Sequence, residues 1–330
     1  MIVEASAPGK LVVLGEYAVL SGGPALAMAV DRRCSAEIAS STGAHCRLHT
    51  RAAESKQLAF APGASSGVDL VDRVAERWPL AVPRAWRGTL DSSALYHAGA
   101  KLGLGSSAAA LVAWAGVWTR YADPASEDPE SAALAALHRR LQSGLGSGLD
   151  VATSRLGGVV AYRLEASGEA RMSSVGLPKS VGFVAVCTGQ PAETPSLLRQ
   201  FGAWRASRPA DALAAIGELK RLATEGIEAV LADDSHGFLE AMAEYGRHLE
   251  KLGERIGADI VTGQHRQVAA CAARHGIAYK ISGAGGGDMG IAFAADPEAL
   301  EAFASAARPV ARILKLSVDP SGLVIRERAE

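Results

Sequence analysis

Hydrophobic and polar positions follow two different periods along the chain. Apolar runs between glycine-rich turns, and polar–apolar alternation, predict strands at Leu11–Leu14, Ala25–Val30, Cys34–Ala39 and Cys46–His49. The spacing of the valines over residues 68–77 instead predicts a helix. The chain is therefore expected to begin with β-structure interrupted by a helix.

The rest of the chain is first mostly helical and then mixed in character. Helices are predicted over residues 108–118 and 131–142, and long amphipathic helices over Asp211–Asp233, Gly237–Leu252 and Ile260–His275. Further strands are predicted at residues 159–162, 181–187, 278–282, 290–294 and 311–316, with a helix at 297–307. Strands, then helices, then strands again predict an α+β protein with two lobes, residues 1–175 and 176–330.

Composition narrows the class of protein. The 330 residues include 34 Lys and Arg against 35 Asp and Glu, so the net charge of −1 gives no general attraction to nucleic acid or to an anionic membrane. The four cysteines form no CxxC pair, which favours reduced structural thiols. No basic, apolar leader opens the chain and no run of about 18 apolar residues occurs, so we expect a soluble, cytoplasmic protein.

The segment KLGLGSSAAA, residues 101–110, is the strongest candidate for chemistry. Gly103 and Gly105 leave the backbone accessible, while Ser106 and Ser107 add hydroxyls at the expected N-cap and first turn of a helix. The N–H groups and dipole of such a helix favour a bound phosphate. The spacing matches neither GxxxxGK[ST] nor GxGxxG. A glycine C-cap followed by a capped helix, without any ligand, is the alternative for this segment alone.

Two further glycine-rich segments accompany this one, APGKLVVLGEYAVLSGGPAL at residues 7–26 and SGAGGGDMG at 282–290. In this order and at these distances, the three segments resemble the motifs of the GHMP kinase superfamily of small-molecule kinases. The resemblance spans essentially the whole chain. It implies an N-terminal lobe like that of ribosomal protein S5 and a C-terminal ferredoxin-like lobe with added helices.

A fourth segment, GSGLDVATSRLGG at residues 146–158, is similar to the GSGxDVA segment of phosphomevalonate kinases. The resemblance implies ATP- and Mg²⁺-dependent conversion of 5-phosphomevalonate to 5-diphosphomevalonate in isoprenoid biosynthesis, by a monomer or homodimer. Mevalonate kinases are close relatives, so a mevalonate, sugar or homoserine kinase is an alternative. A GHMP-fold protein that binds ligand without catalysis is another.

The resemblance also implies roles for two charged residues. Asp150 would orient or deprotonate the acceptor hydroxyl, and Lys10 would stabilise the charge of the transition state. Each has a simpler alternative, because Asp150 suits a helix N-cap and Lys10 suits a solvated strand end.

The remaining implied contacts are with ATP, Mg²⁺ and the acceptor. The phosphates of ATP would lie on Gly103, Leu104, Gly105, Ser106, Ser107 and Ala108, and Ser107 would also hold Mg²⁺. The acceptor would meet Lys101, Tyr17, Ser147, Thr194, Gly285, Gly286, Gly287 and Asp288. A packing role for Tyr17, a surface position for Lys101 and a purely steric role for the glycines are the alternatives.

One segment departs from the phosphomevalonate kinase pattern. These kinases carry a TGxPAST-like segment, whereas this chain reads TGQPAETPS, with Glu193 at an expected serine and Thr194 retained. A carboxylate facing a phosphorylated acceptor would repel it. Glu193 therefore points away, or the acceptor lacks the phosphate, or a cation offsets the charge.

Overall fold

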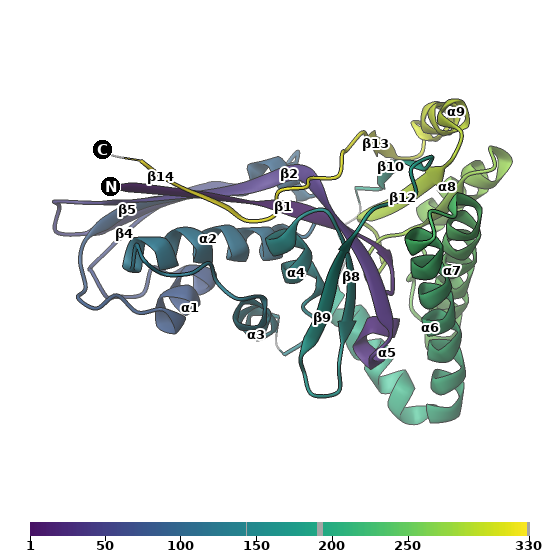
Figure 1. Ribbon diagram of the computed structural model, residues 1–330, viewed down its shortest axis with the longest axis horizontal. Helices are drawn as coiled ribbons and strands as arrows, with labels where there is room; N and C mark the ends of the chain where they lie inside the picture. The colour runs from purple at the N-terminus through teal and green to yellow at the C-terminus, as the bar shows by residue number, and fades with distance from the viewer. Residues whose placement is uncertain (143, 190–193, 329–330) are drawn as a thin grey trace. The chain divides into compact units, whose positions relative to one another are not determined.

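A computed structural model of the chain describes residues 1–142, 144–189 and 194–328 (Figure 1). These residues form two compact units, each assembled from separate parts of the sequence. The first unit contains residues 1–10, 29–157 and 319–330, and the second contains residues 11–28 and 158–318. This division differs from the single boundary expected at residue 175, because β1 (Ile2–Leu14) and β2 (Pro24–Ser40) both run from one unit into the other.

The first unit is built on a sheet in which β14 (Val324–Arg328) lies beside β1, followed by β2, β5 (Trp86–Asp91), β3 (Cys46–Arg51) and β4 (Ser55–Phe60). β3 and β5 are parallel, whereas β14 pairs with β1 in antiparallel register from Ile2↔Arg328 to Ser6↔Val324. Arg33 holds the returning C-terminal segment, because its guanidinium donates to the Asp319 carboxylate at 2.5 Å and to the Gly322 carbonyl at 2.6 Å. The segment up to Arg328 thus completes the sheet of the first unit.

Helices cover one face of this sheet (Figure 1). They are α1 (Asp69–Arg77), α2 (Ser106–Ala122), α3 (Ser131–Leu141) and α4 (Leu149–Leu156). α2 is buried on nearly every side because it contacts β5 and β14 as well as α1, α3 and α4. A short hairpin, β6 (Tyr96–His97) and β7 (Ala100–Lys101), leads into α2.

The second unit contains a separate antiparallel sheet with helices packed on it. The sheet has the order β11 (Ala278–Ile281), β12 (Met289–Ala294), β10 (Gly182–Cys187) and β13 (Arg312–Leu314). α8 (Gly263–Arg274) and α9 (Pro297–Ala307) bury Val268, Cys271 and Phe303 in a common core with Val184, Val186 and Ala292. In the same unit, residues 24–28 of β2 pair with the hairpin of β8 (Val159–Leu164) and β9 (Ala170–Val175).

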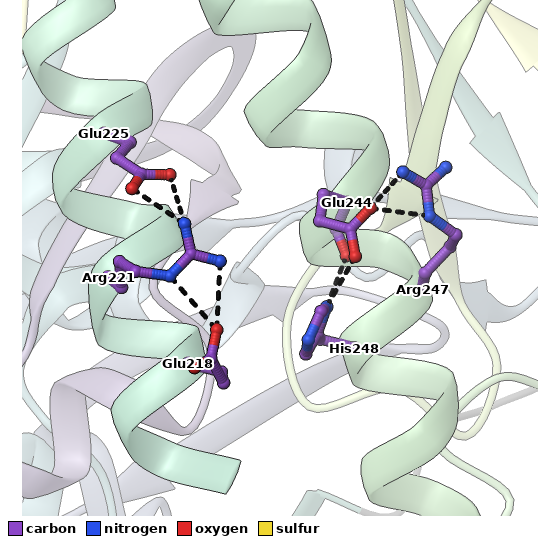
Figure 2. A network of polar contacts seen from close by, with 6 residues as sticks. All are labelled: Glu218, Arg221, Glu225, Glu244, Arg247 and His248. Atoms are coloured by element: carbon purple, nitrogen blue, oxygen red, sulfur yellow. Dashed lines mark hydrogen bonds and ion pairs between the residues drawn. The ribbon is translucent and has the colours of Figure 1, made fainter. Parts of the chain in front are cut away.

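Three further helices of the second unit are α5 (Thr194–Ser207), α6 (Pro209–Leu231) and α7 (Ser235–Ile256), and α6 and α7 lie side by side. Figure 2 shows the charged faces of α6 and α7, where Arg221 bridges Glu218 and Glu225, and Glu244 contacts Arg247 and His248. Each of these ion pairs joins residues three or four apart on one helix. Exposed pairs of this kind contribute little to stability and need no functional explanation.

Most predicted elements are confirmed, and the α+β class with them. The two strands expected at Ala25–Val30 and Cys34–Ala39 are one continuous strand, β2, because neighbouring strands pair with both of its ends. The four cysteines are buried free thiols. Among the described residues, no helix is long and apolar enough to span a membrane.

Candidate functional site

The glycine-rich segment before α2 forms a turn that ends directly at the helix. Gly105 is the N-cap, with φ 72°, and no side chain caps the helix. Ser106 and Ser107 both lie in the first turn, so neither takes the N-cap position that the sequence suggested for one of them. The cap requires the left-handed backbone region, which glycine adopts without strain. The first N–H groups of α2 have no intrahelical acceptor and favour an anion at this end.

Strand β1 packs directly against this turn. The Lys10 amide donates to the Leu104 carbonyl at 2.8 Å. A Cβ atom on Gly105 would lie 3.0 Å from Cε of Lys10 and 3.1 Å from its Cγ. The Lys10 side chain therefore crosses the turn in space that only glycine leaves open.

Lys10 ends at a carboxylate from the fourth motif. Its Nζ lies 3.0 Å from Oδ1 of Asp150, and the two side chains are 8% and 35% exposed. Asp150 is in the first turn of α4, but the N-cap of that helix is Gly148. The Asp150 carboxylate is thus engaged by Lys10, and the N-cap alternative does not apply. The Ser154 hydroxyl donates to the Pro8 carbonyl at 2.5 Å and fixes α4 against β1.

The structure adds His138, which the sequence analysis did not single out. His138 comes from α3, is 4% exposed, and has its Nε2 3.1 Å from the Ser107 hydroxyl oxygen. Burial lowers the pKa of His138, the charge of Asp150 opposes this shift, and that of Lys10 adds to it. The sequence contains one signal for a buried polar residue here. His138 lies four positions after Leu134, and residues four apart share a helix face, so the histidine falls on the apolar face of α3.

The side chains around the turn fit a magnesium ion held mainly by phosphate and water. Mg²⁺ prefers oxygen ligands and retains several waters, so it needs few protein groups. Ser107 offers a hydroxyl oxygen, and Asp150, paired with Lys10 beside the same turn, adds a carboxylate. In the described part of the chain, no group of three or more His, Cys, Asp or Glu side chains could hold a metal by itself.

The first unit therefore combines three chemical features at one place. A helix N-terminus with open N–H groups suits a polyphosphate, a nearly buried ammonium group stabilises negative charge, and a half-exposed carboxylate can accept a proton. Of the residues predicted for the acceptor, Lys101 is exposed on β7, and the Ser147 hydroxyl accepts from the Leu149 amide at 3.2 Å.

The third glycine-rich segment, residues 282–288, belongs to the second unit and is anchored by the first motif. The Val12 amide donates to the Ser282 hydroxyl at 2.8 Å, and the Gly283 amide donates to Oε1 of Glu16 at 3.2 Å. The Tyr17 hydroxyl donates to the Ala284 carbonyl at 2.6 Å. Tyr17 is 3% exposed, and burial raises the pKa of its hydroxyl. These contacts give Tyr17 a packing role in support of the segment.

Glu16 also takes part in a buried ion pair. Its Oε1 contacts the ammonium group of Lys280 on β11, and both side chains are almost fully buried. The Lys280 ammonium lies 5.7 Å from the ring centre of Tyr245, whose hydroxyl donates to the Glu16 carbonyl at 2.8 Å. Loss of either charge would leave the other buried without its counter-charge. The pair therefore links the first motif to β11, the strand that precedes the third segment.

The other end of the third segment is held by a buried histidine. Nε2 of His265 lies 3.3 Å from the Gly287 carbonyl, and its Nδ1 lies 2.5 Å from the Tyr279 hydroxyl. The Asp288 carbonyl accepts from the Thr188 amide at 2.9 Å. Gly285 is pressed onto Ile260, where a Cβ atom would lie 2.3 Å from the carbonyl oxygen. Both ends of the segment are therefore anchored by hydrogen bonds within the second unit.

The predicted residues of the TGQPAETPS segment are only partly described. Thr194 is the first residue of α5 and is half-buried. Glu193, whose charge bears on the choice of acceptor, lies outside the described residues.

Comparison with known proteins identifies relatives over most of the chain. Residues 227–310 match the family described as GHMP kinases C terminal. The chain is 30% identical to the phosphomevalonate kinase of Streptomyces sp. (strain CL190), over 87% of this chain and 88% of that protein. It is 27% identical to the mevalonate kinase of Thermococcus sibiricus, over 93% of this chain and 92% of that protein.

A solved structure confirms the two-lobed fold. The phosphomevalonate kinase of Streptococcus pneumoniae, in complex with phosphomevalonate and AMPPNP, matches with a TM-score of 0.80. The match covers 96% of this chain and 99% of that one, at 21% identity. At this identity the similarity concerns the fold alone.

Proposed function

Because the chain belongs to the GHMP kinase family, whose members are small-molecule kinases that use ATP, we propose that it phosphorylates 5-phosphomevalonate to 5-diphosphomevalonate. The observation that carries this proposal is the Lys10–Asp150 pair beside the N-terminus of α2. Phosphoryl transfer needs positioning and charge stabilisation more than covalent help, and these groups supply both. The reaction would be a step of isoprenoid biosynthesis.

The turn at residues 103–108 would hold the phosphates of ATP. Its backbone N–H groups and the positive end of the α2 dipole stabilise negative charge without a dedicated cation. Gly105 has no side chain beside Lys10, so the phosphate chain can approach the ammonium group.

Asp150 would orient the acceptor oxygen and take up its proton as the bond to phosphorus forms. Lys10 holds the carboxylate in place at 3.0 Å and stabilises the charge that develops on the transferred phosphoryl group. When bound, Mg²⁺ neutralises phosphate charge, and Ser107 is the residue that would hold it.

The choice of acceptor rests on the relatives. The 30% identity to a phosphomevalonate kinase and the GSGLDVA segment support a phosphorylated acceptor. Mevalonate is the second candidate, because Glu193 replaces an expected serine and mevalonate kinases are also similar to the chain. An acceptor without a phosphate would avoid repulsion by that carboxylate.

A steady-state assay of ADP release separates these candidates. The purified protein is given MgATP with 5-phosphomevalonate, mevalonate, homoserine or a sugar, each over the same concentration range. The proposal expects the highest kcat/KM with 5-phosphomevalonate. Turnover of mevalonate with none of 5-phosphomevalonate would replace it with the second candidate, and no turnover of any acceptor would favour a ligand-binding protein.

The role of Asp150 has its own test. Asp150→Ala is expected to lower kcat by several orders of magnitude and to leave nucleotide affinity nearly unchanged, because it removes the proton acceptor but not the phosphate turn. Asp69→Asn, in an exposed ion pair of α1, is the matched control and should retain full activity. Wild-type turnover by Asp150→Ala would exclude the assigned role.

A further inference from the structure

We propose that His138 is a positioning residue of the nucleotide site, whose Nε2 accepts a hydrogen bond from the Ser107 hydroxyl and thereby leaves the lone pairs of the hydroxyl oxygen free to hold Mg²⁺. The inference rests on the proposed ATP site. It adds a residue from α3, which none of the glycine-rich motifs contains.

The hydrogen bonds around His138 assign its donor and acceptor atoms. Nε2 lies 3.1 Å from the Ser107 hydroxyl oxygen and 3.3 Å from the amide nitrogen of Gln142. With the Gln142 amide in this orientation its nitrogen can only donate, so Nε2 carries no proton and the ring proton is on Nδ1. The Ser107 hydroxyl therefore donates to Nε2, and its oxygen lone pairs remain available to a cation.

The surroundings of His138 fit this assignment. His138 is 4% exposed, so the Ser107 hydroxyl and the Gln142 amide serve its Nε2 in place of water. A neutral ring can accept the hydroxyl proton, whereas an imidazolium could only donate.

The burial of His138 gives a second argument for a specific role. It occupies the apolar face of α3 with Leu134 and Leu137, where a hydrophobic side chain would pack at lower cost. Ser107, in contrast, is exposed, so its hydroxyl would otherwise rotate among several rotamers. Joining an exposed hydroxyl to a buried, immobile ring selects one of these rotamers before nucleotide binds, as outer partners of metal ligands commonly do.

A double-mutant cycle tests this role through binding rather than turnover. The amide oxygen of glutamine can replace Nε2 of histidine, whereas that of asparagine stops near the position of Nδ1. His138→Asn, His138→Gln, Ser107→Ala and the His138→Asn/Ser107→Ala double variant are titrated with AMPPNP by calorimetry. Each titration is done once with Mg²⁺ and once with EDTA.

His138→Asn is expected to weaken binding of Mg²⁺–AMPPNP about 5-fold, the equivalent of one ordinary hydrogen bond, and to leave binding in EDTA unchanged. His138→Gln should recover most of this loss. In the Ser107→Ala background, His138→Asn should have no further effect, because its partner is already absent.

The proposal is overturned if His138→Asn binds Mg²⁺–AMPPNP like the wild type, or if it loses affinity equally in EDTA. Additive effects of the His138 and Ser107 substitutions would also overturn it. Thermal unfolding of each variant shows whether a loss of affinity reflects damage to the fold. If His138→Asn is damaged in this way, the affinity of His138→Gln, which retains the polar group, decides whether the proposal holds. Because no acceptor is used, a wrong assignment of the acceptor would leave the cycle intact.

Discussion

We predict that His265 makes the stability of the second unit dependent on pH. The Gly287 carbonyl only accepts, so Nε2 of His265 carries the proton and donates to it, and Nδ1 accepts from the Tyr279 hydroxyl. The neutral ring thus satisfies both contacts. Burial lowers the pKa of His265 from 6.5 to about 4, because a charged ring in this apolar site lacks solvation.

The magnitude follows from proton linkage. The unfolded chain binds a proton at this histidine below about pH 6.5, whereas the folded chain binds it only below about pH 4. Stability therefore falls as the pH falls through this window. At about 1.4 kcal/mol per pKa unit the full loss is about 3 kcal/mol, of which about 2 kcal/mol is lost between pH 7 and pH 5.

Urea unfolding of the wild type and of His265→Gln at several pH values between 7 and 5 measures this effect. The variant cannot titrate at this position, but its amide can still donate to the Gly287 carbonyl. It should be less stable than the wild type at pH 7, because the bond with Tyr279 is lost. Its stability should then fall less steeply, so that the difference between the proteins shrinks by about 2 kcal/mol at pH 5.

The comparison of the two proteins cancels the other titrating groups, because both share them. His236→Gln, an exposed histidine on α7, is the control and should follow the wild type at every pH. Parallel curves for the wild type and His265→Gln would refute the reasoning, since they would mean that His265 has the same pKa in the folded and unfolded chains.

Two further predictions concern Gly105 and Lys280. Gly105→Ala should reduce stability by about 1 to 2 kcal/mol and weaken nucleotide binding, because a side chain there adopts φ 72° and meets Lys10 at 3.0 Å. Gly168→Ala, with a similar φ but open space, should lose stability without losing affinity in a fluorescent-nucleotide titration, and equal losses of affinity would argue against the Lys10 contact. Lys280→Met should cost about 3 to 5 kcal/mol in urea unfolding, because it leaves the Glu16 carboxylate buried and unpaired. Adding Glu16→Gln should restore part of the loss, and a double variant no more stable than the single one would contradict this explanation.

The sequence by itself determined the local structure and the class of fold. Helices such as α6 and α7 follow from hydrophobic periodicity, since burial of one face is encoded by residues close together in the chain. Continuous apolar runs mark α2 and β10 instead. Glycine-rich turns are equally local, because a left-handed backbone at Gly105 depends on the absence of a Cβ atom. These turns, with their flanking residues, also carried the resemblance to the GHMP kinases, and with it Lys10 and Asp150.

The continuity of β2 depended on partners far away in the sequence. Asp31 and Arg32 are exposed polar residues that suggested a break between two strands. The strand continues because β8 pairs with its first part and β5 with its last part. Arg33 adds contacts to Ser6 and Asp319. Hydrogen bonds between strands override the local pattern, and the pattern does not identify the partners.

Only the tertiary structure decided how the motifs are supported. The His138 contact with Ser107 spans 31 positions and that of Lys280 with Glu16 spans 264, and no local spacing rule connects such pairs. A polar side chain on the apolar face of a helix, such as His138 on α3, is expected to need a hydrogen-bond partner. The sequence does not identify that partner, because it depends on how whole helices and strands pack. The residues proposed for the site could therefore be named from the sequence, whereas the buried contacts around them arise from the fold.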